Sequence, residues 1–259
     1  MREIDGRWLY YMFLAGTRKV VANQERLNRI NVFPVKDGDT GANMAFTLSA
    51  VVESVRPERQ YKRMLDQIAE TAMLNARGNS GIIFSQFLFG ISSETAERSS
   101  VSIGPFSASV KNAVRYIYRA VADPVEGTLL TIVRAWAEFI DAKRHQVDDF
   151  GQLFIDSEAI LEKALAETPL QLDALAKANV VDAGANAFVY FIDGIIECIR
   201  KKSIRHLVKS TTDTPVYEIL EDGMPTESHV PQEVAFRYCT EAMMRDVSLD
   251  HSRLSDILT

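Results

Sequence analysis

Apolar residues recur every three or four positions through most of the first two hundred residues. Near the N-terminus Trp8, Met12 and Phe13 follow this spacing, as on one face of a helix. The same spacing predicts further helices over 59–76, 79–92, 106–121, 127–143, 151–166, 170–178 and 184–201. These runs are rich in Ala and contain few clusters of β-branched residues, which favours helix over strand. The pattern therefore predicts an all-α domain.

The pattern changes after about residue 207. Residues 208–230 lose the helical spacing and gain Pro, Thr and Asp, which is typical of a linker. Within 231–259, the stretch VAFRYCTEAMM has the pattern of a β-strand that leads into a helix. We therefore expect a helical domain over 1–207, a linker, and the beginning of a truncated α/β domain that is too short for a core of its own.

Composition and charge narrow the classes of function. The chain has 259 residues, of which 47% are hydrophobic and 25% charged, so it can bury a core. Its net charge of −6 argues against broad nucleic-acid binding but leaves room for a locally positive phosphate pocket. Cys198 and Cys239 form no CxxC or Cys/His cluster, and no secretory signal or membrane-length apolar run is evident. We expect reduced thiols and a cytoplasmic location.

Four short connectors of small and polar residues each precede an apolar helical run. They are VFPVKDGDTG, ARGNSG, ADPVEGT and VVDAGA. If the helices pack as a bundle or barrel, the helix starts after these connectors could gather at one rim. The N–H groups at helix starts favour anions, so such a rim suits a phosphate compound.

The first connector contains the clearest candidate for metal binding. Asp37 and Asp39 are two residues apart, so an extended loop can point both carboxylates the same way. Such hard oxygen ligands suit Mg2+, and Asn31 could add a neutral oxygen. A plain surface turn and a calcium loop are the alternatives, but an EF-hand needs a Glu at its twelfth position, which this segment lacks. The predicted metal ligands are Asn31, Asp37 and Asp39.

An apolar run, AFTLSAVV, follows the first connector. It places Thr40, Gly41 and Asn43 at a helix start, where an anion is favoured. We predict that these three residues contact phosphate.

The second connector offers a similar arrangement. Asn79, Ser80 and Gly81 open the next apolar run, where small residues allow the backbone close to a phosphate and Ser80 adds a hydroxyl. Neither a Walker A motif nor a dinucleotide GxGxxG is present. Taken alone, GNSG is explained as a helix cap.

The third and fourth connectors carry weaker signals. Thr128, Asp182 and Gly184 are each explained adequately by a cap and a tight turn. Their assignment to a nucleotide pocket comes from the resemblance described next.

Read together, NVFPVKDGDTGANM, ARGNSGIIFSQ, EGTLLTIVRAWAE and VVDAGANAFVYFIDG resemble the nucleotide-binding (DhaL-like) subunit of dihydroxyacetone kinases. The resemblance covers residues 1 to about 207, with all four motifs in the same order. It is closer to the kinase subunit of bacterial fatty acid kinase and to relatives fused to a DegV-type fatty-acid-binding domain. The stretch FRYCTEAMM resembles the start of the middle domain of those longer proteins.

This resemblance implies an eight-helix antiparallel barrel that holds ATP or ADP at one rim with two Mg2+ ions. It implies metal ligation by Asp37 and Asp39, with Asn31 where dihydroxyacetone kinases have a further Asp. Those enzymes also have His where this chain has Thr40, which shifts the expectation away from dihydroxyacetone as substrate. No residue of the connectors is assigned as a catalytic base, since an ionised carboxylate acceptor needs none.

Three functions follow from the resemblance. The first is an ATP-dependent kinase that phosphorylates a fatty acid held by a DegV-type protein or domain. The second is a subunit that retains ADP as a coenzyme, and the third is a nucleotide-binding regulatory module without turnover. The expected partners are the nucleotide, the DegV-type protein and, for assembly, a second copy in a homodimer; neither nucleic acid nor a membrane span is expected.

Overall fold

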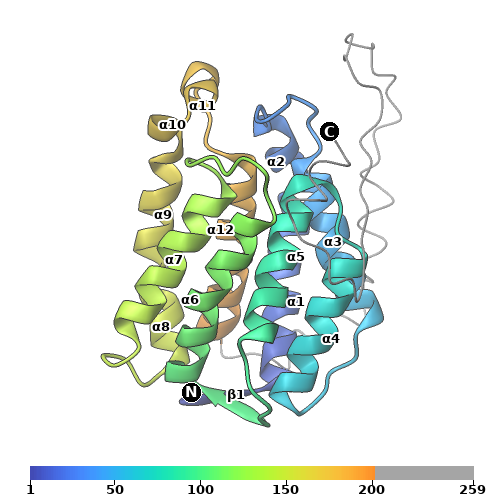
Figure 1. The fold of residues 1–259 in the computed structure, drawn as a ribbon, viewed down its shortest axis with the longest axis vertical. Helices are drawn as coiled ribbons and strands as arrows, with labels where there is room; N and C mark the ends of the chain where they lie inside the picture. The colour runs from blue at the N-terminus through green and yellow to red at the C-terminus, as the bar shows by residue number, and fades with distance from the viewer. Residues whose placement is uncertain (202–259) are drawn as a thin grey trace. The chain divides into compact units, whose positions relative to one another are not determined.

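The computed structural model describes residues 1–201, which form an almost entirely helical domain (Figure 1). The predicted linker and second domain, 208–230 and 231–259, lie outside the described residues, as does the predicted boundary at 207. The elements are β1 (Glu3–Asp5), α1 (Gly6–Ala22), α2 (Gln24–Ile30), α3 (Thr40–Ser54), α4 (Tyr61–Leu74), α5 (Gly78–Ser93), β2 (Ser100–Ser102), α6 (Ile103–Arg119), α7 (Leu129–Lys143), α8 (Phe150–Asp156), α9 (Glu158–Ala166), α10 (Thr168–Gln171), α11 (Asp173–Ala178) and α12 (Ala183–Arg200).

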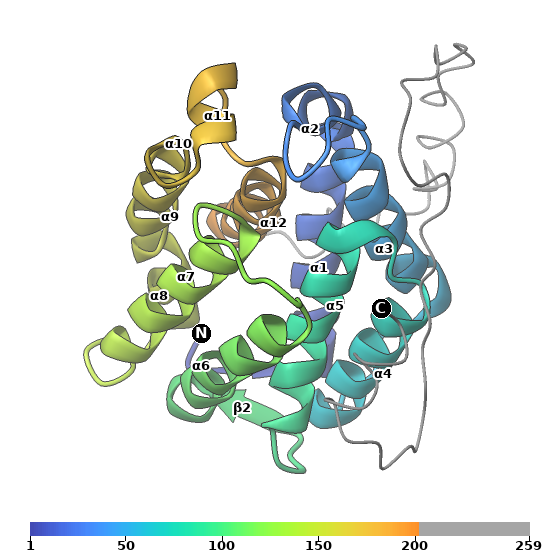
Figure 2. The same cartoon turned by 45° about the horizontal axis from the view of Figure 1, so that its top comes forward.

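Within this part of the chain, eight long helical segments run alternately up and down when α8 and α9 are taken as one (Figure 1). Helices α12, α1, α4, α5, α6 and α7 contact one another in turn, and α7 returns to α12. Helix α3 packs on α1 and α4, while α9 packs on α7 and α12. Figure 2 shows this ring from the end at which α2 and α11 lie. The predicted all-α class and antiparallel barrel are therefore confirmed.

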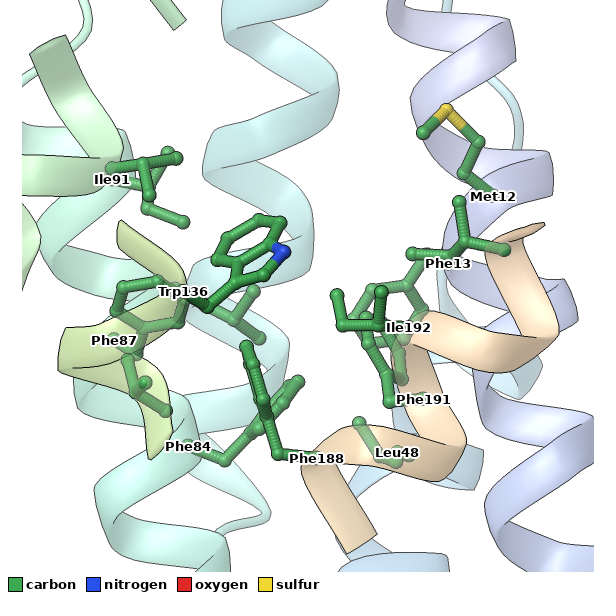
Figure 3. Close-up of a cluster of buried hydrophobic side chains, with 14 of the residues drawn as sticks. Met12, Phe13, Leu48, Phe84, Phe87, Ile91, Trp136, Phe188, Phe191 and Ile192 are labelled. Atoms are coloured by element: carbon green, nitrogen blue, oxygen red, sulfur yellow. The ribbon is translucent and has the colours of Figure 1, made fainter. Parts of the chain in front are cut away.

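Aromatic side chains line the interior of the ring and surround an apolar cavity of about 70 Å³. Phe84 and Phe87 of α5 face Phe188 and Phe191 of α12 and Trp136 of α7, as Figure 3 shows. The rings meet mostly edge to face, with centroids 5.0–6.5 Å apart in these contacts and in the Phe87–Trp136 pair. Edge-to-face aromatic pairs add stability beyond the apolar area that they bury. The apolar faces of the helices therefore account for the closed ring.

Two glycines allow α1 and α12 to cross closely. A methyl group on Gly194 would lie 2.4 Å from the carbonyl oxygen of Ala15, and one on Gly16 would lie 2.6 Å from the ring of Phe191. Both distances are shorter than real atoms tolerate, so the crossing requires residues without a side chain. This contact fixes the last helix of the ring against the first.

The helix boundaries differ from the predicted ones at a few places. The helix predicted over 151–166 is interrupted at Ser157, where the buried hydroxyl accepts a hydrogen bond from Nε1 of Trp136 at 3.1 Å. The helix predicted over 170–178 is divided at Leu172 into α10 and α11. The short helix α2 and the antiparallel pair β1–β2 were not predicted. Each is too short to give a periodic pattern of its own.

Candidate functional site

The first turns of α3, α5, α7 and α12 meet at one end of the ring, around a cavity of about 360 Å³. Figure 2 looks onto this end of the domain. All four connectors contribute to the wall. The lining residues are Phe33, Pro34, Thr40, Asn79, Ser80, Ile82, Ile83, Ala120, Val121, Ala122, Asp123, Val125, Thr128, Leu129, Leu130, Asp182 and Gly184. The gathering of helix starts at one rim, expected from the sequence, is present in the fold.

Asn31 organises the first connector. The side chain is buried, and its Oδ1 accepts hydrogen bonds from the N–H groups of Asp39 at 3.2 Å and Thr40 at 3.0 Å. Its Nδ2 donates to the carbonyl groups of Phe33 and Val35. Because Oδ1 already has two donors, metal ligation by Asn31 would require the loss of at least one of them. Its role as a ligand stays a prediction, while its role in shaping the loop is visible.

Asp37 and Asp39 lie in the exposed part of the same loop, between the cavity-lining residues Pro34 and Thr40. Gly38 between them has φ +67°, a backbone angle that favours glycine. Partial burial of the carboxyl and the charge of Asp39 both raise the pKa of Asp37, although the residue as a whole is exposed. Neither Asp lines the cavity itself, so they form an acidic edge beside it.

Two of the backbone N–H groups at the start of α3 are already hydrogen-bonded to side chains of the protein. Asn31 binds the N–H of Thr40, and Oδ1 of Asn28 accepts from the N–H of Ala42 at 3.0 Å. Gly41 lies under α2, where a methyl group on it would be 2.2 Å from the carbonyl oxygen of Gln24. Of the three residues predicted here to contact phosphate, Thr40 alone lines the cavity.

Asn43, the third residue of α3 that was predicted to contact phosphate, packs against the second connector. Nδ2 of Asn43 lies 2.3 Å from where a methyl group on Gly78 would be, and Gly78 has φ +62°. One turn later, Thr47 Oγ1 accepts from the N–H of Arg77 at 3.0 Å and sits against Gly81. Asn43 and Gly81 thus lie where α3 packs on the α5 start. Their contact with phosphate, like that of Gly41, stays a prediction.

Thr128 and Asp182 are the N-caps of α7 and α12. The Thr128 hydroxyl donates to the carbonyl of Val125 at 2.7 Å and accepts from the N–H of Leu130 at 3.4 Å. Asp182 Oδ2 accepts from the N–H of Ala185 at 2.7 Å. Burial raises the pKa of Asp182 to about 6, against the opposing effect of hydrogen bonds from backbone N–H groups, including that of Leu129. Asp182 therefore joins the starts of two helices.

Gly184 marks the point at which three connectors converge. A methyl group on it would lie 3.2 Å from Oδ2 of Asp182, 3.3 Å from Cβ of Leu129 and 3.4 Å from Oγ of Ser80. The polar groups of Ser80 and Asp182 are thus close neighbours across the cavity floor. Asn79 and Ser80 line the wall from the α5 side.

The apolar wall of the cavity was not predicted from the sequence. Ile82 and Ile83 line it from α5, and Val121 and Val125 from the connector between α6 and α7. The two isoleucines directly follow GNSG, but their spacing also fits a core-facing helix, so the pattern alone does not separate the two roles. With polar helix starts on one side and this wall on the other, the cavity suits a flat apolar ring that carries an anionic group.

Metal binding at this rim would depend on the ligand as well as the protein. Within residues 1–201, no group of three or more His, Cys, Asp or Glu side chains is placed to hold a metal ion. Asp37 and Asp39 supply two carboxylates, and Mg2+ commonly completes its shell with phosphate oxygens and water. The donor set therefore fits a Mg–phosphate complex better than a metal ion alone.

No helix in the described part of the chain has the length and apolar character needed to cross a membrane.

Comparison with protein families finds a match to the DAK2 domain over residues 34–197. That range contains the second, third and fourth connectors in full and the first connector from Pro34 onward, and it includes every residue of the cavity wall except Phe33. Among solved structures, the fold is similar to that of the dihydroxyacetone kinase from C. freundii, determined in complex with AMP-PNP and Mg2+. The TM-score is 0.56 at 16% identity, over 73% of this chain and 33% of that one.

Curated relatives extend the similarity over nearly the whole chain. An uncharacterized Mycoplasma pneumoniae protein, the MG369 homolog, is 31% identical over 90% of this chain and 43% of its own length. Protein YloV of Bacillus subtilis is 28% identical over 95% of this chain and 45% of its own length. The chain thus spans less than half the length of these relatives.

Proposed function

Because the chain belongs to the DAK2 domain family, we propose that it binds ATP or ADP together with Mg2+ in the cavity at the helix starts. The observation that carries this proposal is the convergence of four helix N-termini on one cavity with an apolar wall. The C. freundii kinase of similar fold was solved with AMP-PNP and Mg2+, which supports the same ligand class here.

The nucleotide would lie with its base on the apolar side, against Ile83, Val121 and Val125. Its phosphates would extend past Ser80 and Thr40 toward the exposed loop that carries Asp37 and Asp39. Hydroxyl and N–H donors at these helix starts would bind the phosphate oxygens. Bound Mg2+ would neutralise phosphate charge, and we propose two ions, held by Asp37, Asp39 and, after rearrangement of its present hydrogen bonds, Asn31.

The reaction that we propose is transfer of the γ-phosphoryl group to a fatty acid carboxylate. A carboxylate oxygen forms a bond to the γ-phosphorus as the bond to the β-phosphate oxygen breaks, and ADP leaves with that electron pair. The product is an acyl phosphate. The acceptor is already ionised, so no base is required, and the protein contributes alignment and charge stabilisation.

The fatty acid would be presented by a DegV-type protein or domain in the cytoplasm. Two points support a partner: the motifs resemble DegV-linked kinases, and the chain spans less than half of its curated relatives. We therefore expect little ATP turnover with free oleate alone. Rapid stoichiometric turnover without another protein would exclude dependence on a partner.

Calorimetry of the whole chain with ATP and ADP, in Mg2+ and then in EDTA, tests the binding proposal. We expect binding in Mg2+ and a large loss of affinity in EDTA. Equally tight binding in EDTA would exclude the metal site, and absence of binding in both would exclude nucleotide as the ligand. Retention of ADP through dialysis would favour the coenzyme role over turnover.

A further inference from the structure

The connector between α6 and α7 forms one wall of the cavity. Residues 120–123, Val125 and Thr128 all line it, so the position of this connector determines the width of the space. Its neighbour Glu126 is absent from the lining. The contacts of Glu126 are instead with the two helices that the connector joins.

The Glu126 carboxylate accepts four hydrogen bonds. Oε1 accepts from the Tyr118 hydroxyl at 2.9 Å and from Nη1 of Arg134 at 2.8 Å. Oε2 accepts from Nη2 of Arg134 at 2.9 Å and from the Thr131 hydroxyl. Tyr118 lies on α6, whereas Thr131 and Arg134 lie on α7. We call these four residues the Glu126 clasp.

Further contacts tie the clasp to the end of the connector. The Arg134 guanidinium lies over the Tyr118 ring, 5.8 Å from its centroid. The N–H of Gly127 donates to the Thr131 hydroxyl at 2.8 Å, and Gly127 has φ +82°. A methyl group there would lie 3.0 Å from the carbonyl oxygen of Thr168, so α10 packs against this turn. The connector is thus held on both sides immediately beside Val125 and Thr128.

We propose that Glu126 is a positioning residue, which through the clasp holds the α6–α7 connector closed on the bound nucleotide and so sets its release rate. This inference rests on the proposed function. A connector that is ordered before binding lowers the entropic cost of binding, so loss of the clasp should speed dissociation. The hydroxyls and N–H groups that we assign to the phosphates are untouched, so the chemical step should change little.

Two substitutions of the clasp and one matched control test this proposal. Glu126→Gln keeps the shape and one acceptor oxygen but removes the charge that pairs with Arg134. Tyr118→Phe removes a single hydrogen bond from the same carboxylate. The control is Glu158→Gln, because Glu158 makes a similar two-point ion pair with Arg200 and is similarly exposed, at 34% against 43% for Glu126. That pair joins α9 to α12 and contributes no residue to the cavity wall.

The readout is the dissociation rate of a fluorescent ADP analogue in Mg2+, chased by unlabelled ADP. We expect it to rise about tenfold in Glu126→Gln, to rise less in Tyr118→Phe, and to stay unchanged in Glu158→Gln. With a phosphoryl acceptor in place, KM for ATP should rise while kcat stays near the wild-type value. Melting curves of all variants check that each is folded.

A dissociation rate for Glu126→Gln within twofold of the wild-type rate would contradict the proposed role of the Glu126 clasp. It would leave the proposed function intact. An equal acceleration in Glu158→Gln would also contradict the role of the clasp, since the effect would then follow general stability. If the wild-type chain binds no Mg-ADP, both the proposed function and the proposed role of the Glu126 clasp are wrong.

Discussion

Single side chains determine how many backbone N–H groups at each helix start remain free to bind a ligand. Asn31 and Asn28 bind the N–H groups of Thr40 and Ala42, so α3 offers fewer donors than an uncapped helix would. The Asp182 carboxylate similarly accepts hydrogen bonds from the N–H groups of Gly184 and Ala185 at the start of α12. The Thr40 and Ser80 hydroxyls on the wall are therefore the groups that we expect to contribute most to phosphate binding.

Substitution of the exposed carboxylates of Asp37 and Asp39 distinguishes a role in metal binding from a role in folding. Asp37→Asn or Asp39→Asn removes a like-charge repulsion, so the melting temperature without ligand should stay unchanged or rise slightly. The same changes should abolish the extra thermal stability given by Mg-ATP, because ligand binding stabilises the native state by mass action. Melting curves with and without Mg-ATP measure both effects.

Asp148→Asn serves as the control, since Asp148 is also exposed and pairs with Arg2 at the other end of the domain. It should keep the full ligand shift. A turn-only role for Asp37 and Asp39 predicts the reverse pattern, with lower stability of the free protein and an intact shift.

Burial of Asp182 predicts a pH-dependent stability. Its pKa is about 6 in the folded protein, above the ordinary 3.8, so the folded state binds this proton more tightly than the unfolded chain. The resulting stabilisation is complete below about pH 4 and is lost as the pH rises through 6. Asp182→Asn mimics the protonated form, so its stability relative to wild type should increase by about 2 kcal/mol between pH 4 and pH 7.5.

Urea unfolding of both proteins at several pH values, without nucleotide and with EDTA, measures this difference. Other groups, including Asp193 with its pKa also raised to about 6 by burial, titrate equally in the two proteins and cancel. A difference that is constant over this range would show that Asp182 has its ordinary pKa in the folded state.

Helix α12 takes part in both the candidate site and the close crossing with α1. Its first turn closes the cavity through Asp182 and Gly184, and its second half crosses α1 through Gly194. A change in the distance between α1 and α12 at Gly194 would therefore shift the start of α12 relative to α7. We therefore expect the packing around Gly194 to influence the geometry of the cavity through α12.

Gly194→Ala tests that close crossing. The added methyl group meets the Ala15 carbonyl at 2.4 Å, and a backbone group cannot move aside easily. We expect destabilisation of about 1–3 kcal/mol by urea unfolding, the usual range for overpacking. Gly104→Ala is the control, because nothing lies within 4 Å of the added group and helix propensity favours Ala. Equal stability of the two variants would show that α1 and α12 are not in close contact.

The helices of the ring were predictable from sequence because each buries one apolar face over several turns. Helix α12 begins at Ala183, one residue before the predicted start, and α5 begins at Gly78, also one residue before. The break at Ser157 was not predictable from local periodicity; at this position the hydroxyl accepts a hydrogen bond from Trp136, which lies 21 positions earlier. Short elements such as α2 form because they pack on the ring.

The connectors that form the candidate site were predictable from the sequence. Which of their residues line the cavity was less predictable. Thr40 and Ser80 line the cavity, as the helix-start argument suggests, and so do Thr128 and Asp182, which were assigned to it from the family resemblance. Gly41, Asn43 and Gly81 occupy the same motifs but face neighbouring elements. Gly41 lies against α2, Asn43 against Gly78, and Gly81 against Thr47. Sequence spacing alone cannot show which side of a helix start a neighbour covers.

At the scale of the whole domain, the two ends of the ring differ in character. One end collects the four connectors and the cavity, whereas the other carries the β1–β2 pair and the turn between α7 and α8 (Figure 1). If nucleotide binds as proposed, its effects should be confined to the first end. This asymmetry provides an internal control for locating the ligand.

Hydrogen–deuterium exchange of the whole chain with and without Mg-ADP tests the central claim most directly, because it reports where the ligand binds. We predict slower exchange in the four connectors and the first turns after them, which are residues 31–43, 77–84, 120–130 and 180–186. Residues 94–102 and 144–149, at the opposite end, should exchange as before. Unchanged exchange in all four connectors under saturating Mg-ADP, or protection centred on the opposite end, would contradict the proposed site.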